Sequence, residues 1–171
     1  RRGINIMTPK FRPMRARSSK FVFTNAKECL AAERRHGRMR NLLVAATGTG
    51  KTVVAAFDYR RTCEALGGRP RLLFAAHRRE ILDQARDVFR QIMPTRRFAM
   101  FRGAERDIDG DVVFASVQSL HRHLDGVDPA AFDYVVIDEF HHADAPTYRK
   151  VISHLRPRFL VGLTATPDRS D

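Results

Sequence analysis

Two hydrophobic patterns alternate along this chain of 171 residues. Short, continuous apolar runs are typical of strands buried on both faces. Between them, apolar residues recur every three or four positions, which predicts amphipathic helices. The predicted strands cover residues 42–46, 72–76, 98–101, 111–115, 134–138 and 159–163, and the predicted helices cover residues 26–36, 51–66, 81–92, 116–124 and 146–155.

Buried strands that alternate with helices predict an α/β fold, with a mainly parallel sheet and helices on both of its faces. In such sheets, ligands bind outside the carboxyl ends of the strands. The residues that carry chemistry are therefore expected where a predicted strand ends.

The start of the chain follows neither pattern. We expect residues 1–23 to form a basic, poorly structured lead, in which only Phe21-Val22-Phe23 is strand-like, and residues 24–171 to form the folded domain. The first helix is predicted to begin at Asn25, because Glu28 three residues later makes a plausible capping pair.

Positive charge is concentrated in the same region. The net charge is +12, and residues 1–40 hold twelve Lys and Arg against two Glu. Such a segment could bind a phosphate backbone. Alternatively, the ratio of 26 Arg to 5 Lys reflects only the general composition of the source. Both interpretations stay open at this point.

Several classes of protein are disfavoured. No apolar run approaches the roughly 20 residues that cross a bilayer, and no signal-peptide pattern is present. Cys29 and Cys63 are isolated, and no histidine has metal-site spacing with a second soft ligand. We expect a cytoplasmic protein with no membrane partner and no zinc site.

A glycine-rich loop joins the strand at residues 42–46 to the next helix. Gly48 and Gly50 can adopt backbone angles that a side chain forbids, and they allow a phosphate to approach the backbone. Lys51 suits the β and γ phosphates, and the Thr52 hydroxyl suits Mg²⁺. The loop predicts a phosphate cradle made by Thr47, Gly48, Thr49, Gly50, Lys51 and Thr52.

Two adjacent acids end the strand at residues 134–138. Asp138 can hold Mg²⁺ directly or through water, and Glu139 can deprotonate a water that attacks the γ-phosphate. The alternative is a solvated acid pair at a strand end. The Gly-Lys-Thr loop upstream favours the catalytic interpretation.

The motifs resemble those of a known family. Asp138-Glu139-Phe140-His141 resembles the DExH box of superfamily 2 helicases, and Ala45 stands where their phosphate loops also have alanine. Residues 163–167 resemble motif III, residues 76–82 motif Ia, and residues 114–120 the T-x-Q-type motif. Residues 41–169 are thus similar to the first RecA-like domain of DEAD/DEAH-type helicases, near type III restriction enzyme motor subunits.

The resemblance implies a RecA-like P-loop NTPase domain that uses ATP and Mg²⁺. It implies that Gly48, Gly50, Lys51 and Thr52 bind MgATP, that Asp138 serves the metal, and that Glu139 serves the attacking water. It also implies that His141, Thr164 and Thr166 couple the ATP state to the grip on nucleic acid, and that His77, Arg78, Ser116 and Gln118 lie along the nucleic-acid track.

The resemblance also implies partners. These motors need a second RecA-like domain, normally in the same chain, so we expect weak ATP binding and little ATP turnover from this chain alone. DNA is favoured over RNA as the track. The adenine-reading glutamine of the family is not found upstream of the loop, because Gln84, Gln91 and Gln118 all lie downstream.

Two other functions stay in view. One is a non-catalytic nucleic-acid-binding module with a vestigial nucleotide site, and the other is an RNA helicase. A small-molecule kinase is disfavoured, because it explains neither the acidic box nor Thr164-Ala165-Thr166.

Overall fold

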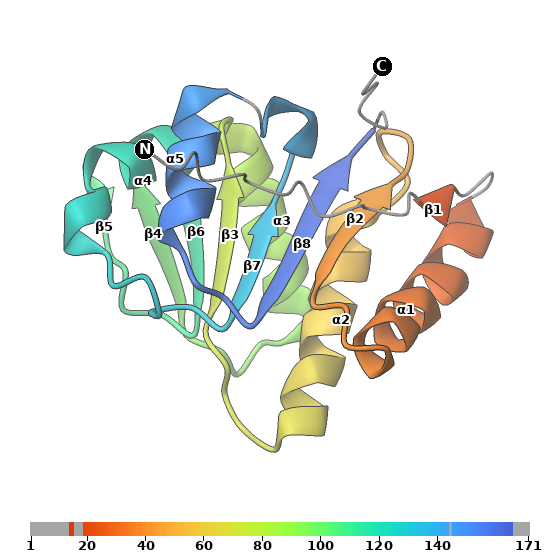
Figure 1. Ribbon diagram of the computed structural model, residues 1–171. Coiled ribbons are helices and arrows are strands. Elements are labelled where there is room, and N and C mark those ends of the chain that lie inside the picture. The colour runs from red at the N-terminus through yellow and green to blue at the C-terminus, as the bar shows by residue number, and fades with distance from the viewer. Residues whose placement is uncertain (1–13, 16–18, 144, 166–171) are drawn as a thin grey trace, which may run out of the picture.

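The computed structural model describes residues 14–15, 19–143 and 145–165, which form one twisted sheet with helices on both faces (Figure 1). The strands are β1 (Met14–Arg15), β2 (Arg40–Val44), β3 (Leu72–Ala76), β4 (Phe98–Arg102), β5 (Glu105–Arg106), β6 (Val112–Ser116), β7 (Tyr134–Ile137) and β8 (Phe159–Thr164). Their order across the sheet is β1-β2-β8-β7-β3-β6-β4-β5. Only the pairing of β4 with β5 is antiparallel among the described strands. The predicted α/β fold is confirmed.

The helices form two layers, one on each face of the sheet. Residues of α1, α2 and α3 share one hydrophobic cluster, and residues of α4 and α5 share the other. Along β3, Phe74 faces the first cluster and Leu73 the second, as the pleat requires. The helices are α1 (Ser19–Arg35), α2 (Lys51–Leu66), α3 (Arg79–Ile92), α4 (Val117–Arg122) and α5 (Pro146–His154), with 3₁₀ turns η1 (Leu124–Gly126) and η2 (Phe140–His142).

The beginning of the domain differs from the prediction. Helix α1 begins at Ser19, so the predicted start at Asn25 is wrong, and residues 21–23 are helical rather than strand-like. The expected limit of the lead at residue 23 therefore falls inside α1. Three apolar residues in a row fit either a strand or a buried turn of helix, so periodicity alone cannot assign them. Residues 1–13 and 16–18 of the predicted lead lie outside the described residues.

A buried ion pair joins α1 to α2. The Arg34 guanidinium donates to both carboxylate oxygens of Asp58, at 2.9 and 2.5 Å, and Asp58 is fully buried. The hydroxyl of Tyr134, the first residue of β7, also donates to Asp58. The guanidinium lies 4.8 Å from the ring centroid of Phe159. These contacts fasten α1 to the sheet near the amino ends of β7 and β8.

Strand β8 carries a glycine where another element packs closely. A Cβ at Gly162 would lie 2.6 Å from Cγ of Phe140 and 2.9 Å from Cδ1 of Leu42. Glycine in a strand often marks such a close approach. The Phe140 ring therefore occupies the space above Gly162 and holds η2 against β8.

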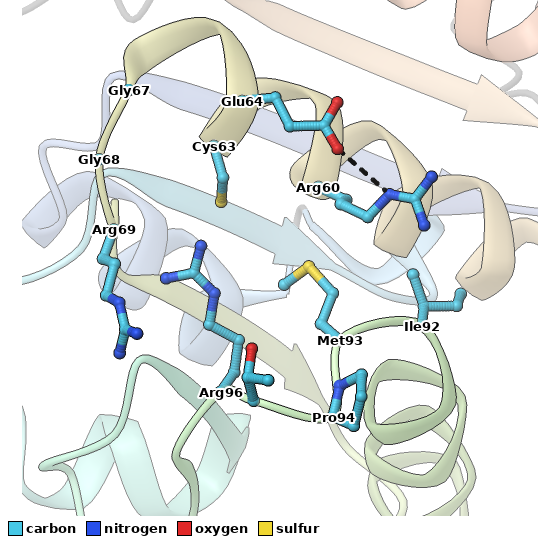
Figure 2. Close-up of a pocket in the computed structure, with 11 residues that line it drawn as sticks. Arg60, Cys63, Glu64, Gly67, Gly68, Arg69, Ile92, Met93, Pro94 and Arg96 are labelled. Carbon is cyan, nitrogen blue, oxygen red and sulfur yellow. Dashed lines mark ion pairs between the residues drawn. The ribbon is translucent and has the colours of Figure 1, made fainter.

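A cavity of about 530 Å³ lies between the C-terminal ends of α2 and α3 (Figure 2). Its lining continues into the segments that precede β3 and β4, so it is at the amino edge of the sheet, opposite the strand ends that carry the motifs. It is lined by Arg60, Cys63, Glu64, Gly67, Gly68, Arg69, Ile92, Met93, Pro94, Thr95 and Arg96. In the part of the chain that the structure describes, no helix is long and apolar enough to cross a membrane.

Replacing Arg34 with alanine is expected to lower the free energy of unfolding by about 3–5 kcal/mol, because Asp58 is then buried without its opposite charge. Urea denaturation followed by circular dichroism measures this. Arg60→Ala is the matched control, since Arg60 pairs with Glu64 at 3.5 Å and both side chains are exposed. Its expected loss is below about 1 kcal/mol. Equal losses in the two variants would contradict the role given to Arg34.

Replacing Gly162 with alanine is expected to lower the free energy of unfolding by about 1–3 kcal/mol, because the new methyl group overpacks the contact with Phe140. The control is Gly126→Ala, where an added Cβ would meet nothing within 4 Å. The same denaturation experiment applies. A Gly162→Ala variant as stable as Gly126→Ala would show that η2 can move away from β8 freely.

Candidate functional site

The predicted site residues that the structure describes lie along the carboxyl edge of the sheet, at the top of Figure 1. Because β2, β8, β7, β3 and β6 are parallel neighbours, their carboxyl ends form a row. The residues at the ends of these strands lie in the same order along the row: the loop at residues 45–50, Thr164, Asp138, His77 and Ser116. Residues that are far apart in the sequence are thereby brought to one edge.

The loop after β2 makes a tight turn into α2. Gly48 and Gly50 have φ angles of 78° and 84°, a left-handed conformation that favours glycine. Gly50 is the residue that caps the N-terminus of α2. The amine of Lys51 donates to the Ala45 carbonyl at 2.8 Å and to the Ala46 carbonyl at 3.1 Å, so it lies at the mouth of the loop.

The three threonines of the loop have different surroundings. The Thr49 hydroxyl donates to the Ala46 carbonyl at 2.6 Å and closes the turn. Thr47 is exposed. Thr52 is half-buried in the first turn of α2, directly after the lysine.

Lys51 and Asp138 interact electrostatically across this edge. Burial lowers the pKa of the Lys51 amine, and the Asp138 carboxylate opposes that shift. Burial also raises the pKa of the Asp138 carboxyl, while the Glu139 N–H and the Lys51 ammonium act in the opposite direction. The Asp138 N–H donates to the Ala75 carbonyl at 2.9 Å and extends the pairing of β7 with β3. The two charged groups therefore belong to one site.

The oxygen donors at this edge fit a magnesium ion that is also held by phosphates. Mg²⁺ takes one or two protein ligands, with phosphates and water completing its shell. The Thr52 hydroxyl and the Asp138 carboxylate supply that number. Within the described ranges, no three His, Cys, Asp or Glu side chains cluster closely enough to hold a metal by themselves.

Glu139 has an unusual conformation. Its φ is 53°, and among the described residues it is the one non-glycine residue with a positive φ. Its Oε2 lies 2.5 Å from Nδ1 of His77, the residue that follows β3. The His77 ring also meets the His142 ring edge-on, with centroids 5.7 Å apart.

Two of the residues predicted to couple the two ligands contact each other at this edge. Nδ1 of His141 and Oγ1 of Thr164 are 3.4 Å apart, and this contact joins η2 to the end of β8. A movement of η2 would therefore be transmitted to the end of β8 through this contact. Thr166, the third predicted coupling residue, lies outside the described residues.

The predicted track residues differ in exposure. Arg78 is exposed at the position that caps the N-terminus of α3, and Gln118 is exposed in the first turn of α4. Ser116 is buried, and its hydroxyl accepts from the Ser119 N–H at 3.1 Å. Arg78 and Gln118 can thus reach a ligand directly, whereas Ser116 caps α4.

Sequence reasoning missed one residue of the site. Tyr148 of α5 is buried, and its pKa is raised to about 12 by burial and by the carboxylates of Glu139 and Asp138. Its ring lies 6.2 Å from that of His142. No local sequence pattern marks Tyr148 as a residue near the site, because only folding brings it close to the two acids.

Comparison with known proteins identifies a family. Residues 11–169 match the model of the family described as "Type III restriction enzyme, res subunit". The chain is 32% identical over 155 residues to a Saccharomyces cerevisiae protein provisionally named ATP-dependent helicase IRC3, covering 80% of this chain and 22% of that one. It is 33% identical over 143 residues to the Type I restriction enzyme EcoAI endonuclease subunit of Escherichia coli, covering 77% and 17%. The chain thus spans about a fifth of the length of these relatives.

Solved structures share the fold. The SWI2/SNF2 ATPase core of Sulfolobus solfataricus in complex with dsDNA has a TM-score of 0.69 at 22% identity, covering 84% of this chain and 31% of that one. The Type ISP restriction-modification enzyme LlaGI, with a DNA substrate mimic, has a TM-score of 0.65 at 21% identity, covering 90% and 18%. The family model spans nearly the whole chain, so this RecA-like, helicase-like domain belongs to the family of the type III restriction enzyme res subunit.

Proposed function

We propose that the chain is the N-terminal motor domain of an ATP-dependent helicase or translocase that acts on nucleic acid. The observation that carries this proposal is that the glycine loop with Lys51 and the acids Asp138 and Glu139 lie at the same edge of the sheet. A relative provisionally named as an ATP-dependent helicase supports it.

The residues of the site suit hydrolysis of the γ-phosphate. The oxygen of a water forms a bond to the γ-phosphorus, and the bond from that phosphorus to the β–γ bridging oxygen breaks. The Glu139 carboxylate takes the proton of the water, and ADP and phosphate leave. Lys51 and the N–H groups of the loop offset the negative charge of the phosphates. Bound Mg²⁺, held by Thr52 and Asp138, would neutralise charge on the β and γ oxygens.

Nucleic acid is proposed to bind farther along the same edge. Arg78 and Gln118 are exposed at the N-termini of α3 and α4 and can contact a phosphate backbone. Two structural neighbours are complexes with dsDNA and with a DNA substrate mimic, so DNA is proposed rather than RNA. His141 and Thr164 would transmit the state of the nucleotide toward this track. A second RecA-like domain is proposed to be required for efficient hydrolysis, since arginine fingers contribute roughly 10³–10⁵-fold in rate.

Replacing Lys51 with alanine is expected to weaken MgATP binding at least about tenfold, because the loop loses the charge that faces the phosphates. Isothermal titration calorimetry on the folded chain measures the affinity. Lys150→Ala is the matched control, since Lys150 is exposed on α5. Equal affinities of Lys51→Ala and the wild type would remove the phosphate-binding role of the loop.

Replacing Glu139 with glutamine is expected to leave MgATP affinity within about threefold, while single-turnover hydrolysis falls by about 10²–10⁴-fold. The amide keeps the shape of the side chain but cannot accept the proton of the water. Phosphate release is measured with protein in excess over ATP. Hydrolysis at the wild-type rate would show that Glu139 is not the base.

A further inference from the structure

The Glu139 carboxylate is in contact with the imidazole of His77. Its Oε2 lies 2.5 Å from Nδ1 of His77, and neither atom is accessible to solvent. A general base must reach the proton that it removes, directly or through one water. In this arrangement the imidazole shields one of the two carboxylate oxygens from water.

The backbone supports the same conclusion. A left-handed conformation in a residue with a side chain is strained and persists only when its surroundings enforce it. Glu139, at φ 53°, is enforced from two sides. On one side His77 contacts its carboxylate, and on the other the next residue, Phe140, is packed over Gly162. Release of the His77 contact would remove one of these two restraints.

His77 is placed between the acids and the proposed track. It follows β3, whose neighbours are β7, which precedes Glu139, and β6, which precedes Gln118. The next residue, Arg78, is exposed at the start of α3. A phosphate bound by Arg78 would bring a second anionic acceptor close to the same imidazole. Phosphate oxygens and carboxylate oxygens are both anionic, so they compete for contact with the same imidazole.

We propose that His77 is a positioning residue that holds Glu139 away from the attacking water until a nucleic-acid phosphate beside Arg78 draws the imidazole away. The inference rests on the proposed function and deepens it. It explains how nucleic acid could control hydrolysis without touching the nucleotide. Displacement of one side chain frees the base, and the phosphate loop does not change.

The test is His77→Ala in the full chain, with single-turnover ATP hydrolysis measured with and without duplex DNA. Without DNA, the variant is expected to hydrolyse ATP about tenfold faster than the wild type, and DNA is expected to add little further stimulation. Its MgATP affinity, measured by calorimetry, is expected to match that of the wild type. His36→Ala is the matched control, because His36 follows α1, is exposed, and its Nδ1 contacts only the Ala32 carbonyl among the described residues.

A DNA-free rate in His77→Ala that is unchanged, or that falls to the rate of Glu139→Gln, would overturn the proposal. In the second case, His77 would orient the base for reaction instead of restraining it. A wild-type chain that binds no MgATP would overturn the proposed function itself, and calorimetry would reveal this before any rate is measured.

A second readout does not depend on turnover. The imidazole ¹⁵N resonances of His77 are expected to shift when duplex DNA is added to the wild type. They are expected to shift in the same direction in Glu139→Gln without DNA, because both changes weaken the contact with the carboxylate. Resonances that do not respond to saturating DNA would overturn the proposal.

Discussion

The parallel pairing of five neighbouring strands is the constraint on which the site depends. Neighbouring strands lie about 4.8 Å apart, so their carboxyl ends form a row with fixed spacing. The order of the strands sets the order of the candidate site residues along this edge. It runs from the phosphate loop through Thr164 and Asp138 to His77 and Gln118. The proposed nucleotide site at one end and the proposed nucleic-acid site at the other would therefore be separated by a few side chains, with Glu139 between them.

The rest of the fold keeps this row rigid. Side chains on alternate faces of each central strand are buried in two separate clusters, one under each helix layer. Gly162 allows η2 to pack directly on β8, which places His141 beside Thr164. Arg34 and Asp58 fasten α1 at the opposite edge, where no predicted site residue lies. The pair of Arg34 and Asp58 therefore stabilises the fold at a distance from the proposed site.

The sequence predicted what depends on local pattern. Continuous apolar runs identified the central strands, and the glycine loop and the acid pair indicated the candidate site, because each of these patterns consists of neighbouring residues. Contacts between distant residues could not be predicted in this way. Neither the approach of Phe140 to Gly162 nor the pairing of Arg34 with Asp58 has a periodic signal, since the partners are brought together by the order of the strands. The predicted start of α1 was wrong for a related reason, because a short apolar run is compatible with a strand and with a helix.

The charges at this edge favour the binding of the proposed magnesium nucleotide. Burial disfavours the charged forms of both Lys51 and Asp138, and each stabilises the charge of the other. A phosphate chain with its cation supplies the missing partners, since the phosphates face the ammonium and the cation faces the carboxylate. Such interactions are stronger where water is excluded than at an open surface. The burial that makes the two charges unfavourable on their own would therefore strengthen their interaction with the proposed magnesium nucleotide.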